Sequence, residues 1–199
     1  MAEAPEPVAD MKAPAEETSA ENQASAQAAA GPEAAPEAAP PPPEDPTLYL
    51  TVPRLDIYGD TVRNDDSQWA LDTGAVKIPS TGFPWQDGAN TYIAGHRIGW
   101  PGTETYYQFY DLPTMQAGDE VYLTDANGTV YTYRVSDIFA VSPSDVWVTD
   151  PIAGRDMISL QTCTETPNDW WTIGPKLFES GPDSGRLIVQ ADKVAVDPA

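Results

Sequence analysis

The sequence predicts a mainly β protein whose strands close into an eight-stranded barrel. Short apolar runs bounded by proline or glycine recur through residues 47–199, a pattern typical of all-β folds. Helical periodicity is scarce in the same stretch, and all 6 Trp, 9 Tyr and 4 Phe fall within it. Runs of this kind are typical of closed or nearly closed barrels with only short helical turns.

Each expected strand is a short run of apolar, β-branched or aromatic residues. In chain order the runs are 48–52, 61–62, 75–78, 90–95, 120–124, 130–138, 156–162 and 186–193. Residues 125–128, Asp-Ala-Asn-Gly, are a hairpin turn signal between the fifth and sixth runs. Residues 105–112 are rich in tyrosine, and they are the one predicted helical turn, with aromatic side chains packed against the barrel.

The first 46 residues differ sharply in composition from the rest. They are almost all Ala, Pro, Glu, Gln and Ser, with no aromatic residue and Lys12 as the only basic one. Such a segment buries too little apolar surface to offset the entropy of ordering the chain, and proline and charge repulsion extend it. We therefore expect residues 1–46 to be a disordered acidic tether and residues 47–199 to be one catalytic domain.

The charge of the chain excludes several classes of partner. The formal net charge is −21, and nonspecific nucleic-acid binding needs a basic face, so we expect no nucleic-acid partner. The same charge argues against direct binding to anionic lipid. No loop carries the regular Asp-x-Asp-x-Asp-Gly spacing of a calcium site, so neither a metal nor a cofactor is expected. One cysteine allows no internal disulfide.

No apolar run approaches the roughly 18 residues that a membrane-spanning helix requires. The opening residues, Met-Ala-Glu-Ala-Pro, are typical of a truncated chain. We therefore expect a membrane anchor to precede this sequence in the full-length protein.

The only histidine and the only cysteine each close a strand-like run and precede a loop. His96 follows Tyr-Ile-Ala-Gly and precedes Arg97 and a glycine-rich stretch, and Cys163 follows Ile-Ser-Leu-Gln-Thr. A lone cysteine is usually a small buried hydrophobe, and a lone histidine usually a structural residue. Position favours chemistry here, because catalytic side chains concentrate where a rigid scaffold gives way to a loop. Arg186, which opens the last run, adds a cation, and together the three side chains indicate a thiol enzyme.

These motifs resemble the sortase family over most of residues 47–193. The motifs are Ile-Ala-Gly-His-Arg at 93–97, Leu-Gln-Thr-Cys at 160–163 and Gly-Arg-Leu-Ile-Val at 185–189, in the family's order of His, Cys and Arg. Val-Pro-Arg-Leu-Asp-Ile at 52–57 is similar to the family's opening strand, and Gly-Asp-Glu-Val at 118–121 to another family motif. The sequence departs from the pattern at Gln161, where many members carry threonine or a small residue.

The resemblance implies an eight-stranded barrel with His96, Cys163 and Arg186 on its fourth, seventh and eighth strands. It also implies cleavage of a sorting signal such as LPXTG or LAXTG between Thr and Gly. Cys163 would form a thioacyl intermediate, His96 would transfer protons, and Arg186 would stabilise the oxyanion. The partners would be sorting-signal peptides of surface proteins and an amine of the cell wall, outside the cytoplasm at a membrane-anchored enzyme.

The Ala-Gly-His-Arg motif and the acidic tail are most similar to class E, the actinobacterial housekeeping sortases, which tend to prefer LAXTG. Residues 45–47, Asp-Pro-Thr, lack the aromatic of a pilin-sortase lid. Two other functions remain open: a thiol hydrolase that uses the same Cys-His pair, and a noncatalytic β-barrel binding module. Strand alternation predicts that Arg97 points away from the cleft. The residues that bind substrate are not predicted.

Overall fold

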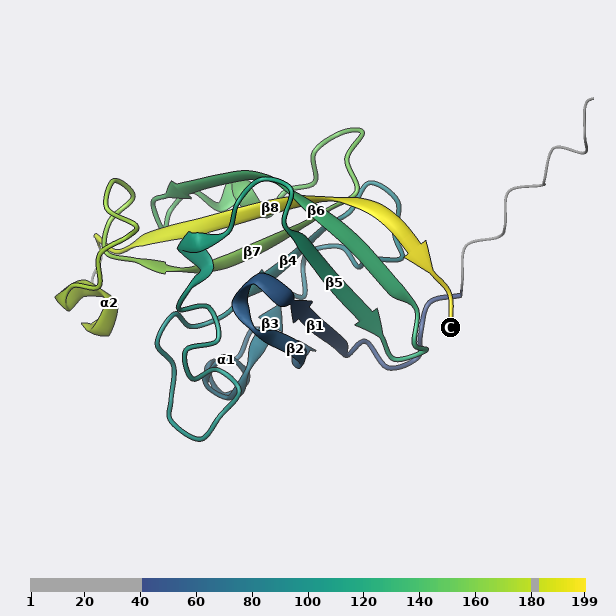
Figure 1. The fold of residues 1–199 in the computed structure, drawn as a ribbon, viewed down its shortest axis with the longest axis horizontal. Coiled ribbons are helices and arrows are strands. Elements are labelled where there is room, and N and C mark those ends of the chain that lie inside the picture. The colour runs from purple at the N-terminus through teal and green to yellow at the C-terminus, as the bar shows by residue number, and fades with distance from the viewer. Residues whose placement is uncertain (1–40, 180–182) are drawn as a thin grey trace, which may run out of the picture. The chain divides into compact units, whose positions relative to one another are not determined.

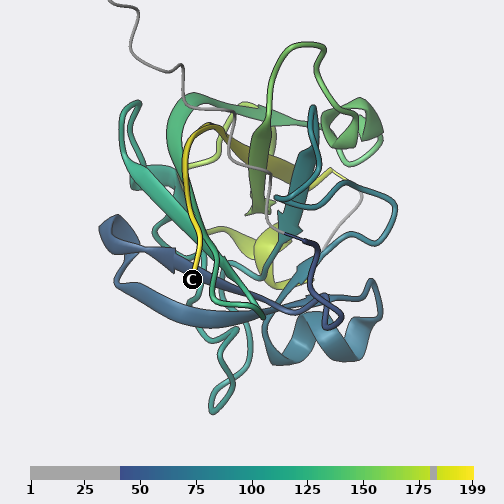
Figure 2. The same cartoon turned by 90° about the vertical axis from the view of Figure 1, so that its right-hand side faces the viewer.

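Eight strands form one sheet that closes on itself in the computed structural model, which describes residues 41–179 and 183–199 (Figures 1 and 2). The strand order around the barrel is β1-β2-β3-β4-β7-β8-β6-β5. The predicted fold class, a mainly β protein with a closed eight-stranded barrel, is therefore confirmed. Most of the predicted tether, residues 1–40, lies outside the described residues.

The predicted strands all form: β2 is much longer than its predicted run 61–62, β3 and β4 each end one residue earlier than predicted, and β5 to β8 end later. They are β1 (Leu48–Val52), β2 (Ile57–Asn64), β3 (Ala75–Lys77), β4 (Asn90–Ala94), β5 (Glu120–Asp125), β6 (Val130–Val141), β7 (Met157–Thr164) and β8 (Gly185–Asp197). The helical elements are short: η1 (Pro53–Leu55), α1 (Gln68–Thr73), η2 (Leu112–Thr114), η3 (Val146–Thr149) and α2 (Pro175–Glu179). None of the helices within the described residues is long and apolar enough to cross a membrane.

Two parallel pairings interrupt an otherwise antiparallel barrel. Strands β2 and β3 pair in parallel, and so do β4 and β7, whereas β7 and β8 pair antiparallel. A parallel pair needs a long crossover connection. The connection between β4 and β7 consists of β5, β6 and their loops, so residues far apart in the chain become neighbours. This pairing brings together the strands that end at His96 and Cys163.

The core fills the inside of the barrel, and its residues follow the period of two that strands impose. Ile158 and Leu160 of β7 and Leu187 and Val189 of β8 all belong to the main buried cluster. Alternate residues of the same strands must then face outward. Cys163 and Gln161 are two residues apart on β7, so both side chains face out of the barrel.

The segment 105–112 is the clearest difference from the sequence prediction. It forms consecutive turns, and the 3₁₀ helix η2 begins only at Leu112. Tyr107 has a φ of 58°, in the left-handed region, which a right-handed helix cannot include. Phe109 is buried in the core, as the prediction of packed aromatics requires, but Tyr106 and Tyr110 are exposed.

One further local prediction needs correction, and another is confirmed. Residues 53–55 do not belong to an opening strand, because they form the 3₁₀ turn η1 between β1 and β2. Pro53 begins that turn, in agreement with the φ that its ring imposes. The hairpin turn at 125–128 is confirmed, with Gly128 at a φ of 91° and its N–H bonded to the carbonyl of Asp125.

The sequence did not predict helix α1. Ser67 is its N-cap, and the Ser67 hydroxyl accepts a hydrogen bond of 3.2 Å from the N–H of Ala70. Ala70 packs against Val76 of β3 and Ala94 of β4 in a small buried cluster. The helix is therefore fixed to the outer face of the strands that lead to His96 (Figure 1).

Candidate active site

Cys163 and Arg186 lie opposite each other on two hydrogen-bonded strands. The register of β7 and β8 pairs Cys163 with Arg186, one residue from the end of the ladder. Directly opposed residues of an antiparallel pair have Cβ atoms about 4.5–5.5 Å apart. Cys163 and Arg186 are therefore neighbouring residues because of backbone pairing, and no loop has to be ordered to bring them together.

His96 reaches the same place through the parallel pairing of β4 with β7. The ladder pairs Ala94 with Gln161, and beyond it the N–H of Gly95 donates to the carbonyl of Gln161 at 3.0 Å. The Thr162 hydroxyl donates to the carbonyl of Gly95 at 2.9 Å. The pairing thus continues to Gly95 and Thr162, one residue past the end of β4. The next residues on the two segments are His96 and Cys163, which are therefore brought side by side.

Gly95 is the residue type that this approach requires. A Cβ at this position would lie 2.7 Å from two ring carbons of Phe109, a fully buried residue of the core. Real Cβ atoms do not come that close, and a packed interior leaves the ring little room to move. The small residue before His96 in the Ala-Gly-His motif therefore has a packing reason here.

The side chains of His96, Cys163 and Arg186 line one cavity of about 440 Å³. Its apolar lining includes Val76, Ile78 and Ala94, from β3, the residue after it and β4. Gln161, the position at which the sequence departs from the sortase pattern, also lines the cavity. The cavity therefore joins an apolar wall to one thiol, one imidazole and the two arginines Arg97 and Arg186.

Of the two arginines that line the cavity, Arg186 makes fewer hydrogen bonds within the described residues than Arg97. Within the described part of the chain its hydrogen-bond acceptor is the carbonyl of the adjacent Gly185, at 3.0 Å from Nη1. Its charge also reaches Tyr92 of β4: burial raises the pKa of the Tyr92 phenol, and Arg186 acts in the opposite direction. A guanidinium has five N–H donors, so most of those of Arg186 remain for a bound group.

The position of Arg97 contradicts the prediction that its side chain points away from the cleft. It lines the same cavity as Cys163 and is 5% exposed. The alternation argument fails because β4 ends at Ala94, so strand geometry no longer governs residue 97. Burial lowers the pKa of Arg97, while Tyr110, Asp111, Cys163 and Asp169 act to raise it, so its charge lies within reach of the thiol.

The guanidinium of Arg97 binds backbone carbonyls from two loops. Nε donates to Tyr110 at 3.3 Å, and Nη1 and Nη2 donate to Trp170 at 3.0 Å and Trp171 at 3.3 Å. The first acceptor lies in the turn segment after β4, and the other two lie between β7 and β8. Arg97 therefore connects the loop that follows His96 to the loop that follows Cys163.

Asp72 is a residue of the site that the sequence analysis missed. Its Oδ1 lies 2.9 Å from Nε2 of His96, and Gln68 donates to the same oxygen at 2.7 Å. Partial burial acts to raise the pKa of Asp72, but hydrogen bonds from His96, Trp100 and Gln68 outweigh it and hold the pKa below its usual value. Asp72 is therefore a carboxylate at neutral pH.

One signal in the sequence could have located Asp72. Ser67 precedes a run of Gln, Trp, Ala and Leu, which matches the N-cap and first turn of a helix. The run is only six residues long, and its pairing with a histidine beyond β3 and β4 is a tertiary contact that local patterns do not contain. In the parts of the chain that the structure describes, no three His, Cys, Asp or Glu side chains gather as metal ligands would.

The fold and the site together define a closed β-barrel protein with a thiol, an imidazole and two guanidinium groups lining one cavity. Residues 50–194 match the sortase domain. Because this match covers most of the chain, the chain belongs to the sortase family.

Similar proteins come from several sortase classes. Over 79 residues the chain is 35% identical to Sortase A of Streptococcus agalactiae serotype III (strain NEM316), a match that covers 39% of this chain. The chain spans 32% of the length of that curated relative.

Solved sortase structures have the same fold. Sortase C1 of Streptococcus agalactiae is 25% identical, with a TM-score of 0.59 over 75% of this chain and 67% of that chain. Sortase C of Streptococcus pneumoniae is 25% identical, with a TM-score of 0.61 over 77% and 71%. Sortase A of Corynebacterium diphtheriae is 24% identical, with a TM-score of 0.60 over 76% and 62%.

Proposed function

We propose that this chain is a cysteine transpeptidase that cleaves a sorting signal between Thr and Gly and transfers the acyl part to an amine of the cell wall. The observation that carries the proposal is the single cavity lined by Cys163, His96 and Arg186. Membership of the sortase family supports the same reaction. The apolar wall beside the thiol suits the extended, largely apolar start of a sorting signal.

In the proposed first half-reaction, the thiolate of Cys163 attacks the carbonyl carbon of the Thr-Gly bond. A thiolate is the competent nucleophile, and nearby cations favour it over the thiol. Arg97 and Arg186 both line the cavity that holds Cys163. The free donors of Arg186 suit the negative oxygen of the tetrahedral intermediate, which collapses to a thioester as the glycine amine leaves with a proton from His96.

In the second half-reaction the acceptor amine attacks the thioester. His96 takes a proton from the attacking nitrogen, and the thiolate of Cys163 is released with the new amide bond complete. The acyl group, the amine and the protons balance without an external oxidant or metal. The same residues act in reverse order because the two half-reactions are chemically alike.

The finer assignment is to class E, with a preference for LAXTG over LPXTG. The Ala-Gly-His-Arg motif around His96 and the acidic segment before the domain support it. The relatives found include class A and class C sortases, so the choice among classes rests on these sequence features. The partners proposed are surface proteins that carry the signal and a peptidoglycan precursor amine.

We propose that the enzyme acts outside the cytoplasm and is anchored to the cell membrane, and membership of the sortase family supports the extracytoplasmic location. Residues 1–46 would then be an acidic tether that carries the catalytic domain, residues 47–199, away from the membrane. Their composition and the match of residues 50–194 to the sortase domain support this division.

Peptide turnover with and without an amine tests the proposal. Fluorogenic peptides with LAXTG and LPXTG signals are incubated with the protein, alone and with triglycine or a diaminopimelate-containing amine. We expect amine-dependent ligation products, more with LAXTG than with LPXTG. If the peptide is cleaved at the same rate with and without the amine, and no ligated product forms, the protein is a thiol hydrolase.

The matched control is Cys163→Ala. We expect this variant to lose thioester formation and turnover completely, because the chain has no other thiol. A variant that loses turnover yet binds the peptide agrees with a nucleophilic role for Cys163. If the wild-type protein binds the peptide but forms neither thioester nor product, the barrel is a binding module and the proposed function is wrong.

A further inference from the structure

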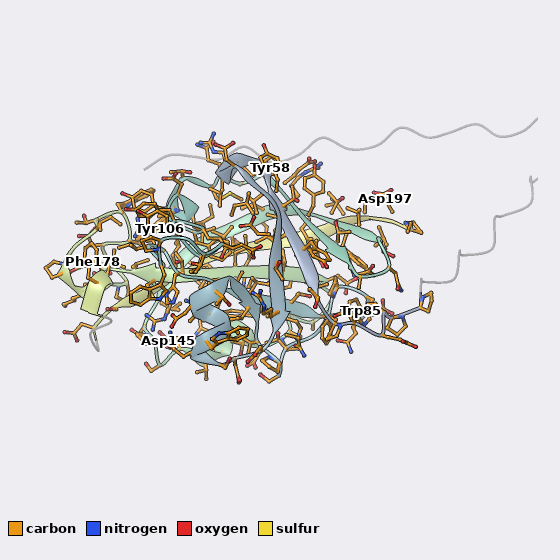
Figure 3. The ribbon with its side chains drawn as sticks, turned by 90° about the horizontal axis from the view of Figure 1, so that it is seen from below. Tyr58, Trp85, Tyr106, Asp145, Phe178 and Asp197 are labelled. Atoms are coloured by element: carbon orange, nitrogen blue, oxygen red, sulfur yellow. The ribbon has the colours of Figure 1, made fainter. Side chains whose placement is uncertain are left out.

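His96 lines two adjoining cavities, which also share Gln68, Ile98, Gly99 and Leu177. The first cavity is lined by Cys163 and Arg186 but not by Asp72. The second, of about 410 Å³, is lined by Asp72, Trp100 and Phe178 but not by Cys163, and Phe178 is labelled on α2 in Figure 3. His96 lines both. Its Nε2 is the nitrogen that contacts Asp72, at 2.9 Å. Asp72 thus contacts the imidazole through Nε2, while Cys163 lines the other cavity.

Asp72 lies on a helix that is capped and packed against the barrel. Its helix, α1, is capped by Ser67 and packed through Ala70 onto β3 and β4. His96 is held from its own backbone as well, because its carbonyl accepts a hydrogen bond from the N–H of Phe109 at 3.3 Å. Neither partner has to move for the contact to form.

The chemistry of the contact fixes the position of a proton. A carboxylate only accepts hydrogen bonds, so the ring nitrogen facing Asp72 must carry a hydrogen. A neutral imidazole has one N–H, so its lone pair then lies on Nδ1. The ring nitrogen that is free to exchange protons in the site is consequently Nδ1.

We propose that Asp72 is a positioning residue, which holds His96 in the tautomer protonated at Nε2 and leaves Nδ1 as the nitrogen that exchanges protons with thiol and amine. Nδ1 takes the thiol proton, the resulting imidazolium keeps its Nε2–H on Asp72, and Nδ1 returns that proton to the leaving amine. The tautomer part of the proposal concerns the resting protein, whereas the kinetic part rests on the proposed function.

The tautomer is measurable because the chain contains one histidine. Long-range ¹H–¹⁵N spectra of the ¹⁵N-labelled protein at alkaline pH, where imidazoles are neutral, report which nitrogen carries the hydrogen. We expect Nε2–H in the wild type and in Asp72→Asn, whose amide oxygen can still accept. Asp72→Ala is expected to show averaged shifts of a tautomer mixture. Asp72→Ala with an unchanged Nε2–H pattern would overturn the proposal.

Kinetics test the consequence for the reaction. We expect Asp72→Ala to lower kcat on the order of 10–100-fold, part of the 10²–10⁴ that acid–base catalysis contributes, with little change in KM for the peptide. Asp72→Asn should recover part of the loss. Wild-type kcat in Asp72→Ala, or an effect confined to KM, would overturn the positioning role.

Asp87→Ala is the matched control, because it removes an exposed carboxylate that lies in neither cavity. It should leave both the nitrogen shifts and the kinetics unchanged, and an equal loss in this variant would assign the effect to net charge. If Asp72→Ala fails to fold, Asp72→Leu replaces it with the same expected outcomes, since leucine has about the size of aspartate and cannot accept a hydrogen bond. Absence of peptide turnover in the wild type would refute the proposed function, while the nitrogen shifts would still test the tautomer.

Discussion

The two sides of the cavity are built differently. Cys163 and Arg186 lie on strands that pair directly with each other, whereas His96 and Arg97 follow the end of β4 and are held by side-chain contacts. On the strand side, backbone register alone makes the two side chains neighbours. On the loop side, Asp72 contacts His96, and Arg97 binds three carbonyls from two loops.

The comparison leads us to expect different roles for the positively charged side chains in and near the cavity. Arg97 and Lys77 are buried cations that bind backbone carbonyls, and both are expected to stabilise loops. Arg186 binds only its neighbour's carbonyl within the described residues and is expected to act on the substrate. Substitution of each cation measures how far this division holds.

Among substitutions of the cations, the largest effect on turnover is expected for Arg186→Ala. An oxyanion donor is worth about 10²–10³ in kcat, so kcat/KM should fall by that order while the melting temperature stays nearly unchanged. Arg186→Lys should recover only part of the activity, because it keeps the charge but loses the planar fork. Steady-state kinetics and thermal unfolding of the two variants provide the measurement. A large fall in Tm for Arg186→Ala would make Arg186 a stabilising residue like Arg97.

Lys77 gives the next largest effect, on stability rather than on turnover. Its Nζ donates to the carbonyls of Ile78 and Thr81 at 3.0 and 2.7 Å and lies 4.0 Å from the centre of the Phe83 ring. Burial lowers the pKa of Lys77 from 10.5 to about 8. Between these values the unfolded chain binds more protons than the folded one, so the contribution of Lys77 to stability rises with pH across that window.

The expected change in unfolding free energy follows from the pKa shift of Lys77, because each pKa unit corresponds to about 1.36 kcal/mol. Relative to Lys77→Met, the wild type should gain about 3 kcal/mol of unfolding free energy between roughly pH 8 and pH 10.5. Urea unfolding of both proteins at several pH values gives the difference, and the Met variant removes contributions from other titrating groups. Parallel stability curves would show that the buried amine does not titrate in this range.

Arg97→Ala is expected to cost about 2 kcal/mol of unfolding free energy, because hydrogen bonds to a charged group contribute about 1.5–3 kcal/mol and water replaces part of what is lost. Its turnover should fall as well, since the loops on both sides of the cavity lose their connection. The measurement is chemical unfolding together with the kinetics used for Arg186. Should Arg97→Ala reduce turnover more than Arg186→Ala without destabilising the fold, the roles assigned to the two arginines would be reversed.

Removal of residues 1–45 is expected to change the least. These residues contain no aromatic side chain, and the proposed catalytic groups all lie after them, so a chain that starts at Pro46 should keep wild-type stability within about 0.5 kcal/mol and wild-type kcat/KM. The same unfolding and peptide assays apply. Loss of folding or turnover on truncation would contradict the tether proposal.

The sequence predicted the strand side of the site better than the loop side for a physical reason. Strand patterns are local, so the runs that hold Cys163 and Arg186 could be found from alternation and turn signals alone. The site of Arg97 could not, because alternation ends with β4 at Ala94. The left-handed backbone of Tyr107 and the contact of Asp72 with His96 depend on tertiary structure, which short segments do not encode.

The parallel pairing of β4 with β7 also determines when the site can exist during folding. Gly95 and Thr162, which join the two strands at the site, are 67 residues apart in the chain. Closing so long a loop costs entropy that is recovered only when the intervening strands also pair, so long-range pairings of this type form slowly and late. A nascent or partly unfolded chain therefore carries a separate thiol and imidazole, and reactivity should appear together with barrel closure rather than before it.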